Sequence, residues 1–356
     1  MKRLSYILSL CFLALCFTGC INKPESKKIK AAGLFRSDAE TFLNAYTAAL
    51  VKAAAANDVD FKLNFCNKDA AVQIDQVKNL LMNGVKYFVI APVDTGLTEQ
   101  IVKLIHSKGG AVAFSNVQPS DAALDIGKNV FYVSSAETSA GDFQAQILDG
   151  YFKKNPNKLS DKTVRILYLN GEVGHSAQIF RRMGFLDGMA RLGYKILIVN
   201  EGTANWTFDT ARQLTDNWIA KGAAFDAIIA QNDDMALGAV ESLIANRYVD
   251  DPSFPKRDTD GDGTALSVPV LGIDATDAAR ASIKEHKLYA TVQQDASGQA
   301  ETALEVVLQC AKKGNAKGFV TKAGIKALTE VSKESPANRA SVIDQCFMVP
   351  FVPVTE

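Results

Sequence analysis

Short hydrophobic runs alternate with longer segments of helical spacing along most of the chain. The first runs span residues 29–35, 61–65, 87–90 and 111–114, and the helical segments between them span residues 42–55, 70–82 and 97–106. Apolar strands separated by amphipathic helices are typical of βαβ units, in which right-handed crossovers join parallel strands. The pattern therefore predicts a parallel sheet that helices cover on both faces.

The same alternation begins again at residue 130. Strands are expected at residues 130–133, 164–169, 195–199, 227–230 and 268–273, with helices at 141–152, 179–192, 208–220 and 235–245. We therefore expect an α/β protein of two Rossmann-like parallel-sheet lobes. Because open parallel sheets bind ligands beyond the carboxyl ends of their strands, two facing lobes would share one cleft.

The N-terminal segment has a different pattern, which is typical of an export signal. A basic start, Met1-Lys2-Arg3, precedes an apolar stretch over residues 4–17 that is too short for a stable membrane span. Phe17-Thr18-Gly19-Cys20 resembles a lipobox, in which small residues precede a cysteine that becomes lipidated. We expect residues 1–19 to be a lipoprotein signal peptide, Cys20 to carry the lipid, and residues 20–28 to form a polar tether. A plain signal peptide with an incidental cysteine is the alternative.

Charge and cysteine content narrow the class of protein. Lysine and arginine total 39, as do aspartate and glutamate, so the balance does not favour a nucleic-acid-binding surface. Six cysteines are too few for a disulfide scaffold of this length. In the mature protein Cys66, Cys310 and Cys346 remain beyond Cys20, and we expect three buried thiols, with a Cys310–Cys346 disulfide as the alternative.

Common catalytic motifs are absent. The sequence has three histidines, no His-Glu-x-x-His zinc motif and no Gly-x-Ser-x-Gly elbow. It also lacks a P-loop and a Gly-x-Gly-x-x-Gly turn after the first strand, so the usual backbone cradles for nucleotide phosphates are missing. These absences favour a binding protein over an enzyme.

Polar and aromatic residues follow several of the expected strands. They are Phe42, Asn116, His175 with Arg181 on the same helix, Trp206, Asn232 and Asp274. A single aspartate or asparagine after a strand is usually a helix cap, and a single aromatic ring is usually core packing. A set of them at one topological position in both lobes instead indicates a ligand site.

The sequence around these residues resembles the periplasmic glucose/galactose-binding proteins, receptors of sugar ABC transporters and chemotaxis. The matching pieces are Gly171-Glu-Val-Gly-His175, Asn232-Asp-Asp-Met-Ala-Leu-Gly-Ala-Val-Glu241 and Val268-Pro-Val-Leu-Gly-Ile-Asp274, within a likeness that covers roughly residues 29–353. The resemblance implies a type I periplasmic binding protein, with a three-strand hinge between its lobes. The expected N-terminal lobe spans residues 29–118 and 295–344, and the C-terminal lobe spans 130–293 and 347–356. The hinge crossings are expected near residues 118–129, Gln294 and Cys346.

In the family, a sugar lies between two aromatic rings, whose positions Phe42 and Trp206 match here. Pyranose C–H faces pack well on such rings, and the sugar hydroxyls need hydrogen bonds when they are buried. The residues that match hydroxyl-binding positions are Asn116, His175, Arg181, Asn232 and Asp274. The sequence departs from the family at Glu40 and Gln294, which replace Asp and Asn, and at Ala177, which replaces a sugar-contacting Asp. The departures leave the identity of the hexose open.

An acidic segment, Asp258-Thr-Asp-Gly-Asp-Gly263, resembles the first half of an EF-hand-like calcium loop. Its candidate ligands are Asp258, Asp260, Asp262 and Thr264. The closing glutamate is missing, because Pro269 stands at its position. A structural calcium ion and a solvated acidic turn both remain open, and no other cofactor is expected.

The resemblance implies an extracytoplasmic receptor that closes over a hexose and delivers it to an ABC permease. A chemoreceptor is a further candidate partner, and a monomer is expected. The receptor would lie in the periplasm or at the outer cell surface, held to the membrane through Cys20. Three alternatives are a receptor for a different aldose or polyol, an exported sugar-processing enzyme on the same fold, and a surface lipoprotein with a vestigial cleft.

Overall fold

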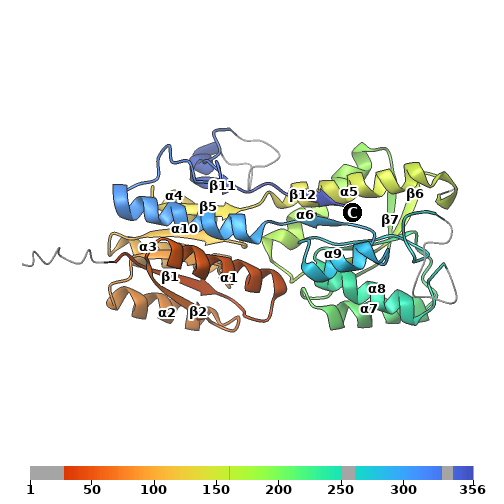
Figure 1. The fold of residues 1–356 in the computed structure, drawn as a ribbon, viewed down its shortest axis with the longest axis horizontal. Coiled ribbons are helices and arrows are strands. Elements are labelled where there is room, and N and C mark those ends of the chain that lie inside the picture. Colours follow the sequence, from red (N-terminus) through yellow and green to blue (C-terminus); the bar gives the residue numbers. More distant parts are fainter. Residues whose placement is uncertain (1–27, 160, 251–260, 331–339, 356) are drawn as a thin grey trace, which may run out of the picture.

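The computed structural model describes residues 28–159, 161–250, 261–330 and 340–355. These residues form two α/β lobes that lie side by side along the long axis of the molecule (Figure 1). The signal peptide, Cys20, nearly all of the expected tether, Asp258 and Asp260 lie outside the described residues. No helix within the described ranges is both long enough and apolar enough to cross a membrane.

The first lobe is built on a six-stranded parallel sheet with strand order β11-β5-β4-β3-β1-β2. Its strands are β1 (Lys30–Phe35), β2 (Asp60–Phe65), β3 (Tyr87–Ile90), β4 (Ala111–Ser115), β5 (Val130–Ser134) and β11 (Cys346–Met348). The connecting helices are α1 (Thr41–Ala56), α2 (Ala70–Met82), η1 (Thr95–Leu97), α3 (Thr98–His106), α4 (Asp121–Asp125), α10 (Ala296–Lys313) and η4 (Ala340–Gln345). The helices cover both faces of the sheet, as the alternating pattern predicts.

The second lobe contains a four-stranded parallel sheet with strand order β7-β6-β8-β9. Its strands are β6 (Thr163–Asn170), β7 (Lys195–Thr203), β8 (Ala227–Ala230) and β9 (Val270–Leu271), and an antiparallel pair is formed by β10 (Thr291–Gln293) and β12 (Val352–Val354). The helices are α5 (Glu137–Lys154), η2 (Pro156–Lys158), α6 (Ser176–Arg191), α7 (Phe208–Ala220), α8 (Asp233–Ala245) and α9 (Asp277–Lys284). Both lobes therefore have the predicted architecture.

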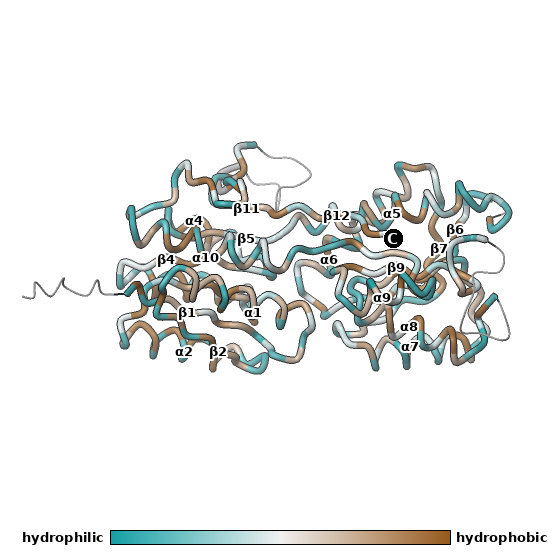
Figure 2. Tube along the Cα trace, viewed as in Figure 1, coloured by the Kyte–Doolittle hydropathy of each residue, from teal (hydrophilic) through white to brown (hydrophobic). Residues whose placement is uncertain are grey.

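Each sheet separates two hydrophobic clusters. In the first lobe, Phe88 and Val112 belong to the cluster on one face, and Val89 and Ala113 to the cluster on the other. Successive side chains of a strand point to opposite faces, so a strand that is apolar throughout supplies both clusters. Figure 2 shows hydrophobic residues recurring along the helices and strands of both lobes.

The boundary predicted between the lobes is wrong at two of its three positions. Residues 130–134 form β5, which pairs with β4 in the first sheet, and residues 346–348 form β11, which pairs with β5. Residues 118–129 are therefore a crossover within the first lobe, and its helix α4 is only five residues long. A helix this short, next to Pro119, has too few residues for helical periodicity, so the sequence predicts a linker there.

The chain crosses between the lobes at residues 135–136, 294–295 and 349–351, which follow β5, β10 and β11. Only the crossing near Gln294 lies where it was predicted. Phe351 packs beside these segments with Ala140, Ile273 and Val292 in a small hydrophobic cluster. Gln293 pairs with Val352 in the β10–β12 ladder, and Gln299 Nε2 donates to Ser135 Oγ at 2.7 Å, so the three crossings lie close together and can act as a single hinge.

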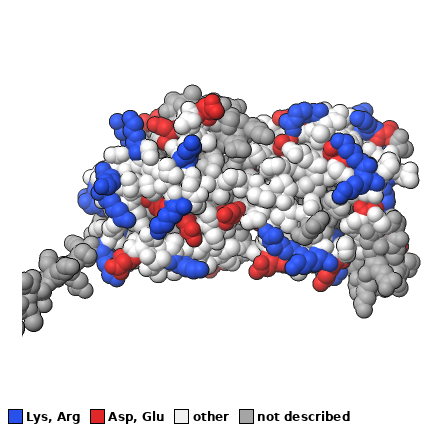
Figure 3. All heavy atoms as spheres, turned by 45° about the horizontal axis from the view of Figure 1, so that its top comes forward, with Lys and Arg blue, Asp and Glu red and all other residues white. Residues whose placement is uncertain are grey.

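The three cysteines of the described chain, Cys66, Cys310 and Cys346, are buried thiols, and the alternative disulfide between Cys310 and Cys346 does not form. Figure 3 shows lysine and arginine side chains interspersed with aspartate and glutamate over this face of both lobes. This mixture agrees with the balanced charge of the sequence.

Candidate ligand-binding site

A small cavity lies between the lobes, beyond the carboxyl ends of both sheets. It is lined by all nine predicted ligand-binding residues, Glu40, Phe42, Asn116, His175, Arg181, Trp206, Asn232, Asp274 and Gln294. Arg36, Thr41 and Ala177 complete the lining. The structure thus brings together, in one site, side chains that lie more than 250 residues apart in sequence.

His175 and Asn116 meet across the cleft. His175 precedes α6, and its Nδ1 accepts a hydrogen bond from the Ala177 backbone N–H at 3.1 Å. Its Nε2 lies 3.3 Å from Asn116 Oδ1, so the neutral ring donates there from Nε2. Burial, and then the charges of Arg36, Arg181 and Lys68, hold the pKa of His175 well below its usual value. His175 is therefore a neutral donor.

Arg181 is held on three sides by the protein. Its Nε donates to Glu137 Oε2 at 2.7 Å, one terminal nitrogen donates to the backbone carbonyl of Gln231, and the other donates to Gln294 Oε1 at 2.8 Å. Both carboxylate and guanidinium are almost fully buried. Glu137, which sequence reasoning missed, begins α5 and carries no sequence signal that distinguishes it from a helix-cap residue.

Trp206 reaches the cavity through an unusual local backbone. Asn205 and Trp206 both have positive φ angles, of 52° and 67°, which are uncommon for residues other than glycine. The indole ring packs on Gly171, where an added Cβ would overlap the ring. Asn232, the N-cap of α8, donates from Nδ2 to the Trp206 carbonyl at 3.2 Å. These contacts fix the ring, which also lies edge-on to His175 at a centroid distance of 5.0 Å.

Phe42 supplies an aromatic ring from the first lobe. It is the second residue of α1, and it is half-buried, with its ring 6.3 Å from that of Tyr46. Tyr46 in turn accepts a hydrogen bond from Ser115 at the end of β4, at 2.7 Å. The packing of α1 on the strand ends thus positions Phe42 beside the cavity.

Asp274 and Gln294 follow strands of the second lobe, close to the hinge. Asp274 has a φ angle of 125°, a strained conformation of the kind that gathers at functional sites. A hydrogen bond of 2.8 Å from its N–H to the Val292 carbonyl holds the segment. Gln294 accepts from Arg181 through Oε1, which leaves its buried Nε2 without a protein acceptor. Both residues therefore retain polar atoms for a ligand.

Arg36, Lys68 and Glu172 form ion pairs across the cleft that sequence reasoning missed. The Glu172 carboxylate of the second lobe lies 2.9 Å from Lys68 Nζ and 3.4 Å from Arg36 Nη1. Arg36 also pairs with Glu40 at 2.5 Å. Arg36 directly follows β1, the same topological position that marked the other site residues, so its position could have identified it.

In the described half of the acidic loop, Asp262 and Thr264 bind to other groups of the protein. Asp262 accepts hydrogen bonds from Tyr151 at 2.7 Å and from the Thr264 N–H at 2.9 Å, and it pairs with Lys158 at 2.7 Å. The Thr264 hydroxyl donates to the His286 carbonyl at 3.2 Å. Within the described ranges no group of three or more acidic, histidine or cysteine side chains could hold a metal. Calcium at this loop stays a prediction, because Asp258 and Asp260 lie outside the description.

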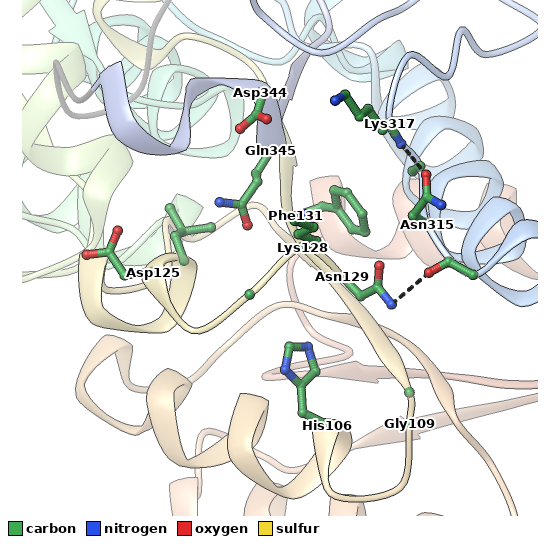
Figure 4. A pocket seen from close by; sticks show the side chains of 15 residues that line it. His106, Gly109, Asp125, Lys128, Asn129, Phe131, Asn315, Lys317, Asp344 and Gln345 are labelled. Atoms are coloured by element: carbon green, nitrogen blue, oxygen red, sulfur yellow. Dashed lines mark hydrogen bonds between the residues drawn. The ribbon is translucent and has the colours of Figure 1, made fainter.

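A second and larger hollow lies at the opposite end of the first lobe (Figure 4). It is bordered by the loops before β4 and β5 and by the end of α10, with His106, Asn129 and Asn315 among its lining residues. Asn129 donates to the Gly314 carbonyl at 3.2 Å, and one aromatic ring, Phe131, contributes to the wall. It lacks the paired aromatic rings of the interlobe cavity, which is the better candidate site.

Two hinged lobes with a cavity lined from both sides have the architecture of a ligand-binding receptor. The chain belongs to the periplasmic binding protein family, because residues 34–316 match the model of the periplasmic binding protein domain. The proteins of this family are receptors, so the chain is a binding receptor and not an enzyme, and it works outside the cytoplasm.

Individual relatives cover most of the chain. A protein of Rhizobium meliloti named for rhizopine binding is 32% identical over 71% of this chain and 75% of its own length. The D-galactose/methyl-galactoside binding periplasmic protein of Haemophilus influenzae is 26% identical over 68% of this chain and 70% of its own. An ABC transporter solute-binding protein from Bacillus halodurans C-125, solved with bound myo-inositol, is 28% identical with a TM-score of 0.70, covering 92% and 95% of the two chains.

Proposed function

We propose that the chain is the receptor of an ABC transporter for a sugar or polyol, and that it binds its ligand as a six-membered polyhydroxylated ring. The observation that carries the proposal is the pair of aromatic side chains, Phe42 from one lobe and Trp206 from the other, in the wall of one interlobe cavity. Ring C–H groups pack on aromatic faces, while Asn116, Asp274 and Gln294 provide polar atoms for hydroxyl groups.

Two ring chemistries are the candidates. The resemblance of the sequence supports a hexose of the glucose or galactose type, and the galactose-binding relative agrees with it. The solved relative with myo-inositol supports a cyclitol, which presents a six-membered ring of similar size. Ala177 has no polar side-chain atom, and Gln294 is engaged by Arg181, so the hydrogen bonds differ from those that the resemblance implies for galactose.

A calorimetric panel of hexoses, pentoses and inositols tests the proposal. The wild-type protein should bind at least one six-membered ring saturably, and Trp206→Ala and Phe42→Ala should each weaken that binding. Aromatic contacts contribute about 0.5–1.5 kcal/mol beyond buried area, so each loss should be several-fold or larger. Phe208→Ala, which removes a partly exposed ring outside the cavity, is the matched control. Unchanged affinity in both cavity variants would rule out the stacking site.

We further propose that Cys20 anchors the mature receptor to the membrane, with the ABC permease as its partner, and that the receptor is a monomer. The lipobox-like Phe17-Thr18-Gly19-Cys20 supports the anchor. Cys20→Ser should move the protein into the soluble fraction and abolish acyl labelling. Palmitate incorporation that persists in this variant would refute the assignment of the lipid to Cys20. Binding to a chemoreceptor stays a prediction.

A further inference from the structure

The chain enters the first lobe at the end opposite the interlobe cavity. The cavity lies beyond the carboxyl ends of the strands, so the edge of the first sheet where its parallel strands begin forms the outer end of this lobe. β1 begins at this edge with Lys30, two residues after Lys28, the first described residue. Lys28 stands eight positions after Cys20, and eight residues reach at most about 29 Å. The proposed lipid site is therefore close to this end.

Lysines gather at the outer end of the first lobe, in the loops that lead into β1 to β5, at the end of α10 and around η4. They are Lys28, Lys30, Lys86, Lys108, Lys128, Lys312, Lys313 and Lys317, and all except Lys30 are exposed. The acidic residues of the same segments are Asp58, Asp60, Asp125 and Asp344. Figure 3 shows Lys and Arg side chains at this end, on the left. Lysines outnumber aspartates here, so this lysine-rich end has a positive net charge.

Most of these lysines have no ion pair with the described residues. Lys28 pairs with Asp58, and Lys30 donates to the Asn83 carbonyl at 3.1 Å. The others, for which the described chain provides no such partner, are Lys86, Lys108, Lys128, Lys312, Lys313 and Lys317. Helix C-termini favour nearby lysines, which accounts for Lys312 and Lys313 in the last turn of α10. The remaining four lie in loops, so their charges are available to a partner.

The loop lysines surround two depressions of the lysine-rich end. Lys128 and Lys317 line the hollow of Figure 4. Lys28 and Lys86 line a second depression, next to the point where the chain enters the lobe, together with Met82 at the end of α2. The Met82 side chain is 76% exposed. Long apolar side chains flanked by lysines suit the boundary between lipid headgroups and acyl chains.

We propose that the lysine-rich end binds the anionic phospholipid surface of the membrane that holds the lipid anchor. The inference goes beyond the receptor function and takes from the proposed anchor only the short reach between Cys20 and Lys28. Lysines within a Debye length of about 8 Å are attracted by anionic lipids, and a basic patch beside one lipid anchor gives a second membrane signal. The hinge and the second lobe then lie away from the membrane, so the cleft can open while the first lobe stays bound.

Vesicle co-sedimentation tests the inference without the anchor. The protein is the mature chain, residues 20–356 with Cys20→Ser, produced without lipid. It should bind vesicles of equal parts phosphatidylglycerol and phosphatidylcholine, and it should not bind phosphatidylcholine alone. Binding should weaken as NaCl is raised, because salt screens the attraction. Absence of binding to the mixed vesicles, or equal binding to both kinds, overturns the inference.

Three substitutions locate the surface. The triple variant Lys86→Gln, Lys128→Gln and Lys317→Gln removes exposed lysines from three separate segments. One lysine at an anionic membrane contributes about fivefold in affinity, so the triple variant should bind the mixed vesicles at least about tenfold more weakly. Its melting temperature should be close to that of the parent, because none of the three side chains is buried.

The matched control removes the same charge from the outer end of the second lobe, at the other end of the long axis (Figure 1). Lys154→Gln, Lys195→Gln and Lys221→Gln change exposed lysines at the end of α5, the start of β7 and the end of α7. This variant should bind the vesicles like the parent. Equal losses in the two triple variants would mean that overall charge causes the binding, which overturns the inference.

Tryptophan fluorescence locates the contact. Met82→Trp should be quenched by lipids that carry bromine on their acyl chains, whereas Leu197→Trp, at a half-exposed position on β7 of the second lobe, should not. The parent protein, whose two tryptophans are buried, gives the background. Quenching of Leu197→Trp without quenching of Met82→Trp would place the membrane at the second lobe and refute the inference. None of these outcomes affects the calorimetric panel, so the receptor function is tested separately.

Discussion

Glu137 shows how a residue outside the cavity can control one that lines it. Its carboxylate fixes the Arg181 guanidinium from behind, at 2.7 Å, and both groups are almost fully buried. Glu137→Gln should leave the arginine charge buried without a counter-ion, which costs about 3–5 kcal/mol in comparable pairs. We expect lower stability in urea unfolding and weaker ligand binding by calorimetry.

The adjacent arginine provides the control for that experiment. Arg182 pairs with Glu201 at the same distance of 2.7 Å, but about a third of each side chain is exposed. Glu201→Gln should change stability by only about 0–1 kcal/mol, because solvent screens exposed pairs. Equal effects of the two substitutions would show that burial does not determine the strength of the Arg181–Glu137 pair.

The raised pKa of Asp233 leads us to expect that the stability of the protein depends on pH. Burial raises its pKa from 3.8 to about 7, although Thr291 and Thr276 donate to it and lower the pKa again in part. In the unfolded chain Asp233 ionises near pH 4, whereas in the folded chain it keeps its proton up to about pH 7. Between about pH 4 and pH 7 the folded state therefore binds more protons than the unfolded state. The free energy of unfolding should fall as the pH rises through this range, by up to about 1.4 kcal/mol per pH unit.

The comparison of wild type with Asp233→Asn isolates this effect from other titrating groups. The melting temperature of the wild type should fall relative to that of the variant between pH 4 and pH 7. Above pH 7 the difference should be constant. A difference that is the same at every pH would mean that the Asp233 pKa is not raised.

At the scale of elements, the close crossing of α5 and α6 places Arg181 beside Glu137. Gly141 on α5 and Gly184 on α6 each face the backbone of the other helix, where an added Cβ would overlap main-chain atoms. Gly184→Ala should push the helices apart, destabilise the protein by about 1–3 kcal/mol and weaken ligand binding. Thermal unfolding and calorimetry measure the two effects.

Gly150, also on α5, is the matched control. A Cβ at this position meets no atom within 4 Å. Gly150→Ala should therefore stabilise the protein by about 0.4–1 kcal/mol through the unfolded chain, with no change in affinity. If Gly184→Ala behaved in the same way, the helix crossing would not be the constraint that positions Arg181.

The sequence predicted elements and strand-end residues well, because both depend on local patterns. Hydrophobic periodicity placed helices such as α2 and α7 at the observed residues, and the residues chosen at strand ends line the cavity, as do Glu40 and Gln294, which came from the family resemblance. Prediction from the sequence failed where a feature depends on contacts between residues far apart in the chain. β5 belongs to the first sheet because it pairs with β4 and β11, and the α4 pattern alone cannot reveal that pairing. Glu137 was missed because its partner lies 44 residues away.

At the scale of the whole molecule, polar contacts join the two lobes in the closed arrangement. Glu172 pairs with Lys68 and Arg36, Thr41 donates to Asp234 at 2.7 Å, and the Gln118 N–H donates to Ser176 at 3.1 Å. A ligand can shift the open–closed equilibrium only through its differential affinity for the two states. These contacts stabilise the closed state before a ligand adds its own contribution.

Removing the cross-cleft ion pairs should therefore favour opening. Glu172→Gln should enlarge the ligand-free protein in solution scattering and weaken ligand binding a few-fold, since exposed pairs contribute about 0.2–1 kcal/mol each. The wild-type affinity should also decrease with salt more steeply than that of the variant. Glu241→Gln, an exposed charge on α8, is the control.

Scattering with and without a saturating ligand tests closure itself. The wild-type protein should become more compact when the ligand binds, because residues from both lobes contact it. Its melting temperature should rise with ligand concentration, as for any ligand that binds only the folded state. Superimposable scattering curves in the two conditions would contradict a closure mechanism.

The chain returns to the first lobe only after it has formed the second, and this path affects the order in which the lobes fold. The second lobe is nearly complete once residues 137–293 have emerged, whereas the first still lacks α10 and its edge strand β11, which ends at Met348 (Figure 1). Pairing strands so distant in sequence is slow, because loop-closure entropy opposes it. The lobe that is made first should therefore finish folding last, and a chain still being exported would keep its N-terminal half incompletely folded until its C-terminal residues arrive.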